Sequence, residues 1–209
     1  MKIVLLGAPG AGKGSQAELI GKKYGIAHVS TGEAFRSNLK EKTMIGLYAK
    51  TFMDKGLLVP DEIVVEIVES RLKLENCKNG FMLDGFPRSI VQAEFLDKFT
   101  KLDCVINIEV PFDVIIKRLS GRRSCVCGAI YNIESHKSDK CPKCGEILFT
   151  RDDDREEAIK NRLKVYESTT APLVEYYENK GLLKTVVGAD TIVDTFKKVE
   201  LVLDQLANR

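Results

Sequence analysis

The residues from Gly7 to Ser15, which read GAPGAGKGS, constrain this chain more than any other stretch of its sequence. They follow the apolar run Ile3–Leu6, so a strand leads into a glycine-rich turn and then a lysine at the start of a helix. Glycines let the turn point its backbone N–H groups inward, and the helix adds the positive end of its dipole. Lys13 adds a mobile positive charge for the outer phosphates. The pattern predicts a phosphate-binding loop (P-loop) for a nucleotide, against the weaker alternative of a loop that only turns the chain.

The hydroxyl of this loop stands one residue later than in the simplest form of the pattern. There, Ser or Thr follows the lysine directly and meets Mg²⁺. Here Gly14 follows Lys13, and the hydroxyl comes at Ser15. This shift points away from GTPases and motor ATPases and favours small-molecule kinases.

Composition and charge narrow the class of protein. The 209 residues suit one domain with insertions, and 44% of them are hydrophobic, which is enough for a core. The 32 basic and 30 acidic residues nearly balance, so we expect no nucleic-acid partner and no membrane surface. No apolar run approaches the roughly 20 residues of a membrane span, and no signal-peptide pattern opens the chain. We therefore expect a cytoplasmic protein whose six cysteines are thiols or metal ligands rather than disulfides.

Short apolar runs alternate with amphipathic stretches along the chain. Runs rich in Val, Ile and Leu without strict alternation are typical of parallel strands buried on both faces. We expect strands at Ile3–Leu6, Ala27–Val29, Phe81–Leu83, Val105–Val110 and Leu183–Val187. Helical patterns lie at 13–24, 61–72, 89–98, 112–119, 155–180 and 191–207. This order predicts an α/β fold, a doubly wound parallel five-stranded sheet that carries the P-loop, with ligands beyond the carboxyl ends of its strands.

Two segments interrupt this alternation, and we expect each to form a lobe over the central crevice. Residues 30–59 are helical and contain no predicted strand, and residues 121–154 are rich in Cys, Gly and charge. We therefore divide the chain into a core domain (1–29, 60–120 and 159–209), a helical lobe (30–59) and a small lid (121–158).

A second informative run, Leu83–Arg88, begins where a predicted strand ends, and Gln92 follows one helical turn later. Asp84 can hold Mg²⁺ through water, and Arg88 can bind a phosphate with its planar fork. Arginines recur where the chain could face the crevice, and phosphoryl transfer needs such a positive clamp, although a single arginine is usually a solvated surface residue. The arginines in question are Arg36, Arg88, Arg118, Arg122, Arg151 and Arg162.

Taken together, these motifs resemble the adenylate kinase family over essentially the whole chain. The resemblance rests on the P-loop at 7–15, Ser30-Thr31-Gly32 with Arg36, residues 84–88 with Gln92, Gly121-Arg122-Arg123, and residues 151–162. Two departures from the family pattern are small, since Ser15 stands where threonine is usual and Glu33 where aspartate is frequent.

The resemblance implies a site for two nucleotides. ATP would contact Gly10, Ala11, Gly12, Lys13, Gly14, Ser15, Arg118, Arg122, Ile130 and Tyr131. AMP would contact Thr31, Arg36, Leu57, Leu58, Val59, Gly85, Arg88, Gln92, Arg151 and Arg162, with Gln92 reading the adenine edge. Catalysis would rest on Mg²⁺ and on Lys13, Asp84, Arg88, Arg122, Arg151 and Arg162. The family also implies an AMP-binding helical lobe, a mobile lid that Asp153 and Asp154 help to hold closed, and a monomer.

Four of the six cysteines, Cys125, Cys127, Cys141 and Cys144, fall within the predicted lid. Two close pairs separated by residues 128–140 outline a tetrahedral site for a structural zinc ion, with no position left for substrate. The first pair has one intervening residue, where zinc-lid members of the family typically have two. A metal-free lid with reduced thiols and a lid with disulfides are the alternatives.

The two histidines carry no pattern of their own. His136, in the loop between the cysteine pairs, is a substitute zinc ligand if Cys125 or Cys127 fails to reach the ion. Neither His28 nor His136 has a carboxylate or serine arrangement that suggests nucleophilic catalysis, so we expect both to be non-catalytic.

The resemblance implies Mg²⁺-dependent, reversible transfer of the γ-phosphoryl group of ATP to AMP, which gives two ADP. One alternative is another nucleoside monophosphate kinase, with UMP, CMP or GMP as acceptor or GTP as donor. A more distant one is a zinc-ribbon binding module that uses ATP as a switch.

Overall fold

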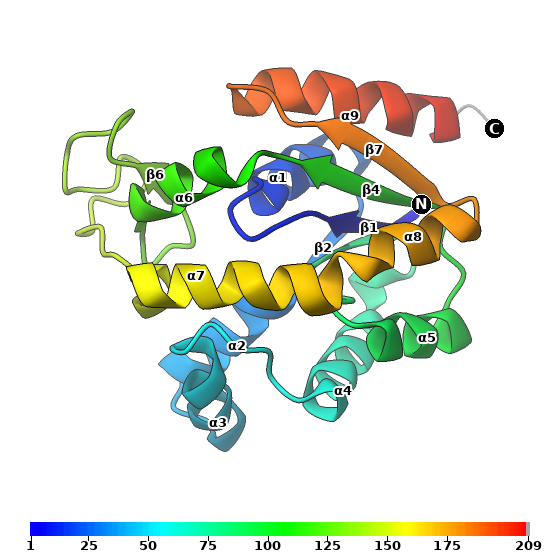
Figure 1. Cartoon of the computed structure of the whole chain (residues 1–209), viewed down its shortest axis with the longest axis horizontal. Coiled ribbons are helices and arrows are strands. Elements are labelled where there is room, and N and C mark those ends of the chain that lie inside the picture. Colours follow the sequence, from blue (N-terminus) through cyan, green and yellow to red (C-terminus); the bar gives the residue numbers. More distant parts are fainter. Residues whose placement is uncertain (208–209) are drawn as a thin grey trace.

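The protein, seen in a computed structural model that describes residues 1–207, folds around a parallel five-stranded sheet (Figure 1). The strand order is β2-β3-β1-β4-β7, so the first strand of the chain lies at the centre. The strands are β1 (Lys2–Leu6), β2 (Ala27–Ser30), β3 (Phe81–Asp84), β4 (Cys104–Glu109) and β7 (Leu183–Val187). The predicted fold class is confirmed, and each expected strand lies within one residue of its expected bounds.

Several helices begin at a side chain that caps their first turn. Ser30, Thr43 and Ser89 each accept a hydrogen bond from the backbone N–H three residues on, a group that a helix leaves unpaired. The helices are α1 (Lys13–Tyr24), α2 (Thr31–Lys40), α3 (Met44–Met53), α4 (Asp61–Leu72), α5 (Ile90–Phe99), α6 (Phe112–Ser120), α7 (Glu156–Val165), α8 (Pro172–Asn179) and α9 (Ile192–Ala207), with 3₁₀ turns at Glu75–Cys77 and Asp152–Asp154. None of them, within residues 1–207, is both long and apolar enough to cross a membrane.

Successive residues of the central strand point to opposite faces of the sheet, as the pleat requires. Ile3 and Leu5 pack in one buried cluster with residues of α1, α6 and α9. Val4 and Leu6 pack in a second cluster with residues of α4, α5 and α8. Figure 1 shows α9 above the sheet and α4 and α5 below it. The strand is therefore apolar at each of these positions because both of its faces are buried.

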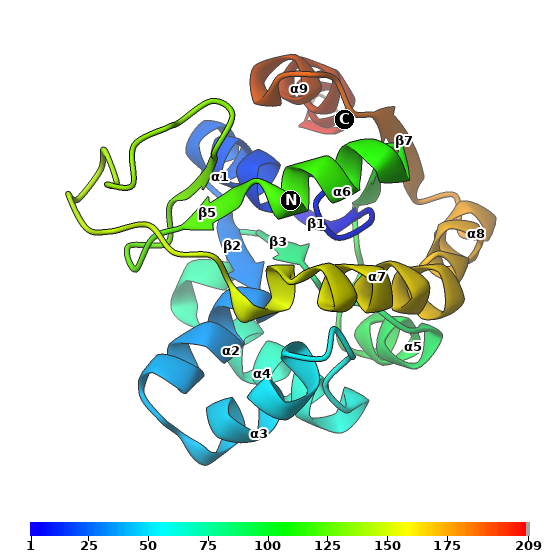
Figure 2. The ribbon, with the colours of Figure 1, turned by 60° about the vertical axis from the view of Figure 1, so that its left-hand side comes forward.

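Two segments extend from the sheet toward the same side of the molecule, the left in both views (Figure 2). Residues 30–59 contain α2 and α3, which pack against each other. Residues 121–158 contain an antiparallel pair of strands, β5 (Arg122–Ser124) and β6 (Ile130–Asn132), that the sequence did not predict. The P-loop lies between these two segments.

The predicted helix over residues 155–180 is wrong in one respect, because it is interrupted. α7 ends at Val165, a π-helical turn spans Tyr166–Thr170, and α8 begins at Pro172. Pro172 has no N–H to donate to the preceding turn. Within the π-helical turn, the hydroxyl of Thr170 donates to the backbone carbonyl of Arg88, 2.9 Å away. The irregular turn therefore contacts the loop after β3, which helical periodicity alone could not predict.

Candidate active site

The P-loop joins the end of β1 to the start of α1, at the carboxyl edge of the sheet. A Cβ on Gly7 would lie 2.5 Å from the carbonyl oxygen of Ile108, so only glycine fits where the loop leaves the strand. α1 begins at Lys13 after Gly12, and no side chain caps its first turn. The first backbone N–H groups of the helix are therefore available to an anion.

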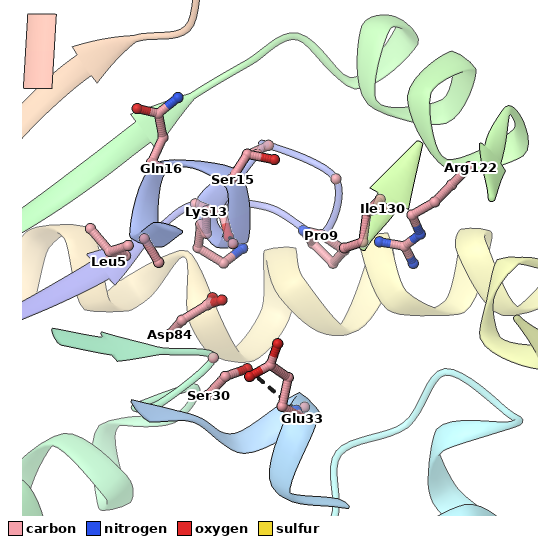
Figure 3. A pocket seen from close by; sticks show the side chains of 18 of the residues that line it. Leu5, Pro9, Lys13, Ser15, Gln16, Ser30, Glu33, Asp84, Arg122 and Ile130 are labelled. Carbon is pink, nitrogen blue, oxygen red and sulfur yellow. Dashed lines mark hydrogen bonds between the residues drawn. The ribbon is translucent and has the colours of Figure 1, made fainter. Parts of the chain in front are cut away.

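Lys13 lies against the P-loop itself. Its ammonium group donates to the carbonyls of Gly7 at 2.7 Å and Ala8 at 3.0 Å. Burial lowers the pKa of Lys13 to about 8; the Asp84 carboxylate opposes this change, and the charge of Arg88 adds to it. Figure 3 shows the Lys13 side chain pointing toward Asp84. A phosphate bound at the loop would favour the charged form of this lysine.

Asp84 reaches the same place because β3 is a neighbour of β1, with Leu5 opposite Asp84 in the register. On its other side, His28 Nε2 of β2 lies 3.4 Å from Asp84 Oδ2. Burial raises the pKa of Asp84, but the contact with His28 and the charge of Lys13 outweigh burial and hold this pKa below its ordinary value. The sequence showed no carboxylate arrangement at His28, whose non-catalytic role stays a prediction, and the structure adds the contact with Asp84. The contact depends on the order of the strands, which no local pattern reveals.

A hydrogen-bond network joins the loop after β3 to α2, α4 and α5. The hydroxyl of Thr31 and the side chain of Arg88 both donate to the carbonyl of Gly85, at 2.9 and 2.8 Å. Gln92 accepts from the backbone N–H of Arg88 and donates to Asp61, each at 2.7 Å. A carboxylate can only accept, so the two bonds fix the orientation of the amide. The sequence did not single out Asp61 as a partner of Gln92.

Two predicted arginines, Arg122 and Arg162, converge on two aspartates, and a third, Arg151, donates to the hydroxyl of Ser124. Arg122 makes a forked contact with Asp154, whose side chain is fully buried, with Nε 2.7 Å from Oδ2. Arg162 lies 3.0 Å from a carboxylate oxygen of Asp153 and 3.3 Å from one of Asp154. Burial lowers the pKa of Arg151, and the charge of Arg122 lowers it further. Asp153 and Asp154 therefore hold the guanidinium groups of Arg122 and Arg162 in one region, and an incoming phosphate would compete for them.

A cavity of about 1300 Å³ connects these groups. Because typical small-molecule pockets have about 300–1000 Å³, it has room for more than one ligand. Every residue predicted to contact a nucleotide lines it, and Figure 3 shows Lys13, Arg122 and Ile130 around it. The structure thus brings the predicted set together, while the individual roles in binding and catalysis stay predictions.

The cavity wall also includes residues 189–192, which no motif marked. Arg118 donates to the carbonyl of Ala189 at 3.1 Å, and Gln16 donates to the carbonyl of Ile192 at 2.9 Å. Both contacts use backbone oxygens, which every residue carries. The sequence therefore offers no signal for this part of the wall.

The four lid cysteines form a compact group. Their sulfur atoms all lie within 4.8 Å of one another, with Cys125 and Cys144 3.4 Å apart and Cys127 and Cys141 3.7 Å apart. Zinc–sulfur bonds of about 2.3 Å place the sulfurs of a tetrahedral site about 3.8 Å apart, so this donor set fits the ion. The one-residue spacer of the first pair does not prevent convergence. His136 contacts the carbonyl of Lys140 at 2.9 Å rather than joining the group.

A P-loop at the edge of a parallel sheet, a buried carboxylate beside it and converging arginines define a nucleotide-binding phosphotransferase of the α/β class. Comparison with known proteins narrows this class. The family model described as adenylate kinase matches residues 5–182. The chain therefore belongs to the adenylate kinase family.

Individual relatives agree with the family match over nearly full length. The chain is 54% identical over 208 residues to an adenylate kinase of Caldicellulosiruptor saccharolyticus, and the alignment covers 95% of this chain and 97% of the relative. It is 52% identical over 212 residues to an adenylate kinase of Lachnospira eligens, which covers 97% and 100% of the two chains. A third, from Thermodesulfovibrio yellowstonii, is 48% identical over 214 residues, which covers 98% and 100%.

Proposed function

We propose that this protein is an adenylate kinase, which transfers the γ-phosphoryl group of ATP reversibly to AMP and forms two ADP. The observation that carries the proposal is the shared cavity, which joins the P-loop to the Thr31–Arg88–Gln92 network, with converging arginines around it. Family membership and the named relatives support the same reaction.

The donor nucleotide would lie on the P-loop side. Its phosphates would bind the open N–H groups at the start of α1 and replace the carbonyls of Gly7 and Ala8 as partners of Lys13. Its base would lie against residues 189–192, close to Arg118 and to Ile130 of β6.

The acceptor would lie on the network after β3. Gln92, whose amide orientation Asp61 and the Arg88 backbone fix, would read a base edge. Arg36 and Arg88 would bind the acceptor phosphate, and the backbone of Leu57–Val59 would cover the nucleotide. Burial lowers the pKa of Arg88, and the Asp84 carboxylate opposes this change.

In the proposed reaction, an oxygen of the AMP phosphate forms a bond to the γ-phosphorus of ATP. The bond between this phosphorus and the β,γ-bridging oxygen breaks, and ADP leaves with that oxygen. No covalent enzyme intermediate is required, so the chain contributes position and positive charge. Lys13, Arg88, Arg122, Arg151 and Arg162 would supply that charge around the transferred group. Mg²⁺, which Asp84 would hold through water, supplies further neutralisation of the phosphates.

The lid would hold a structural zinc ion. Its four thiolates fill every position of a tetrahedral ion, so none remains for substrate. The buried apolar cluster of the lid contains only Cys125, Cys141 and Leu148, so metal binding would supply much of its folding free energy. Protein purified without chelator should contain about one zinc per chain by elemental analysis, and a value well below one would contradict this assignment.

The division into a core, an AMP-binding lobe (30–59) and a lid (121–158) belongs to the same proposal, as do a monomeric state and a cytoplasmic location. Closure of both segments would exclude water from the cavity and so limit hydrolysis of ATP. Sedimentation or size-exclusion measurements at working concentration would test the monomer.

The first test of the function is an acceptor comparison. Mg²⁺-ATP is mixed with AMP, GMP, CMP or UMP, and ADP formation is followed. ADP that depends strongly on AMP supports the proposal, whereas preference for another monophosphate moves the acceptor assignment, and no acceptor-dependent turnover in folded, zinc-loaded protein overturns it.

Substitution of the P-loop lysine tests the mechanism. Lys13→Met should remove most turnover and leave the fold intact, because the charge on the transferred group loses a partner. Lys73→Met is the matched control, since Lys73 directly follows α4, outside the cavity wall, with its side chain 65% exposed. Near-normal turnover in Lys13→Met would refute the role given to the lysine.

A further inference from the structure

Tyr131, at the centre of strand β6, belongs to two sites at once. Its ring lines the nucleotide cavity, and it also packs against the buried cluster formed by Cys125, Cys141 and Leu148. The family resemblance assigns Tyr131 to ATP binding. In the structure, its hydroxyl lies 3.4 Å from Cys141 Sγ, and so the polar end of the side chain is directed at the lid cysteines.

The surroundings fix the ring in this position. The imidazole of His136 packs on it, with ring centroids 5.0 Å apart and the planes tilted by 38°. Tyr131 of β6 also pairs through its backbone with Arg123 of the antiparallel strand β5. The phenol therefore contacts the sulfur without needing to reorganise.

The chemistry of the contact follows from what each group can donate. A phenolic O–H is a donor, and the sulfur of a thiolate is an acceptor with no proton of its own. Four thiolates around a divalent ion leave two excess negative charges, so a donor to one sulfur stabilises the group. Within residues 1–207, Tyr131 provides the side-chain hydroxyl that contacts this group.

We infer that Tyr131 is a positioning residue for the lid metal centre: its hydroxyl donates to Cys141 Sγ and fastens the metal centre to strand β6, the donor-side wall of the nucleotide cavity. The inference rests on the proposed zinc site. Its consequence for the nucleotide site runs along the strand, because the next residue, Asn132, pairs with Arg122. Loss of the hydroxyl would loosen the metal and the wall that carries Arg122.

The test compares Tyr131→Phe with Tyr48→Phe in the full zinc-loaded chain. Tyr131→Phe keeps the ring and its packing and removes the hydroxyl alone. Tyr48 is the matched control because it lies on α3, outside the lid, and is 47% exposed. Zinc release into an excess of a colour-forming chelator is measured, together with the sulfur-to-cobalt charge-transfer band of the cobalt-loaded proteins.

Removing an outer partner of a metal ligand typically weakens metal binding roughly 10- to 100-fold. We expect Tyr131→Phe to release zinc faster by that factor and to shift the cobalt band, while Tyr48→Phe matches the unsubstituted protein. The KM for ATP should rise several-fold in Tyr131→Phe with the KM for AMP unchanged, a split that a general loss of stability would not produce.

The outcomes separate the two proposals. Unsubstituted protein that binds no zinc overturns the zinc site and this inference with it. Unsubstituted protein that binds zinc, with Tyr131→Phe releasing it at the same rate and showing the same cobalt band, overturns the role of Tyr131 and leaves the zinc site intact.

Discussion

The helical lobe (30–59) and the lid (121–158) border the same cavity, but they are attached to the molecule in different ways. In the helical lobe, Phe35, Ala49 and Val59 belong to the buried cluster that also contains Val4 and Leu83 of the sheet. The buried cluster of the lid is separate from both clusters of the sheet and has only three members, two of them cysteines. One segment is therefore an extension of the main core, whereas the buried apolar contacts of the other are its own few.

This difference follows from the physical demands on small segments. A segment of a few tens of residues buries too little apolar surface to be stable alone, and either shares a larger core or requires a crosslink or a metal. α2 and α3 take the first course. With the proposed zinc ion the lid would take the second, because its turns carry glycine, charge and cysteine rather than a long apolar run.

The largest effect is expected from removing one buried side chain of each segment. Phe35→Ala should lower the global free energy of unfolding by about 3–5 kcal/mol, since it opens a cavity in a core that the sheet shares. Leu148→Ala should leave global unfolding nearly unchanged and raise local opening of the lid, because its cluster does not contact the sheet clusters. Denaturant titration gives the first quantity, and amide hydrogen exchange of residues 121–158 gives the second. Equal loss of global stability in both variants would remove the distinction between the two segments.

Removing the metal comes next in size. Arg151 donates to the hydroxyl of Ser124 at 2.7 Å, and Ser124 directly precedes Cys125, so the proposed zinc site would hold the strand that orients this arginine. Loss of one positioned charge donor typically costs about 100-fold or more in turnover. We therefore expect Cys141→Ser, or zinc removed by chelator, to lower turnover about 100-fold while the affinity for AMP changes little.

Calorimetric titration of AMP and a turnover assay on the same zinc-free sample check this prediction. Cys77→Ser is the control, since Cys77 is buried outside the lid. A zinc-free protein with normal turnover would show that the lid does not need its metal.

The parts of the fold that the sequence predicted are those set by local pattern. Strand β1, the P-loop and α1 follow one another in the chain. The apolar run, the glycines and the lysine were therefore sufficient to predict all three. The cysteines converge for the same reason, because two short turns carry them. The hairpin of β5 and β6 escaped prediction since each strand has three residues and no alternating pattern.

The contacts that escaped prediction are those between elements distant in the chain. His28 meets Asp84 only because β2 pairs with β3. Asp61 holds Gln92 only because α4 packs beside α5. The turn that interrupts the predicted helix at 155–180 also makes such a contact, because the hydroxyl of Thr170 donates to the backbone carbonyl of Arg88.

A smaller effect is expected from pH. It should not distinguish the two segments, because Lys13 belongs to neither of them and lines the cavity that they share. Burial lowers the pKa of Lys13 to about 8, so the free enzyme loses this charge as the pH rises through that value. The kcat/KM for ATP should therefore fall roughly tenfold between about pH 7 and pH 9, whereas kcat changes less because bound phosphates favour the charged lysine. Lys13→Arg stays charged over this range, so its kcat/KM for ATP should not show this fall at alkaline pH, whatever its absolute activity. The same fall of kcat/KM in Lys13→Arg would assign the titration to another group.

The smallest effect is expected where the two segments touch. Lys50 of α3 lies 2.6 Å from Asp54, which directly follows this helix, and 3.3 Å from Asp152, which precedes α7 in the lid. Both partners of the bridging pair are over a third exposed, at 37% and 52%, so solvent screening limits its contribution to about 0–1 kcal/mol. A double-mutant cycle with Lys50→Met and Asp152→Asn should give a coupling energy in that range that vanishes in high salt. A second cycle, with Lys50→Met and Asp54→Asn, is the control within the helical lobe. A coupling energy well above this range would mean that an ion pair joins the two segments as well as the cavity they share. Phe35→Ala and Leu148→Ala should then affect the opening of both segments together, which would contradict the distinction between them.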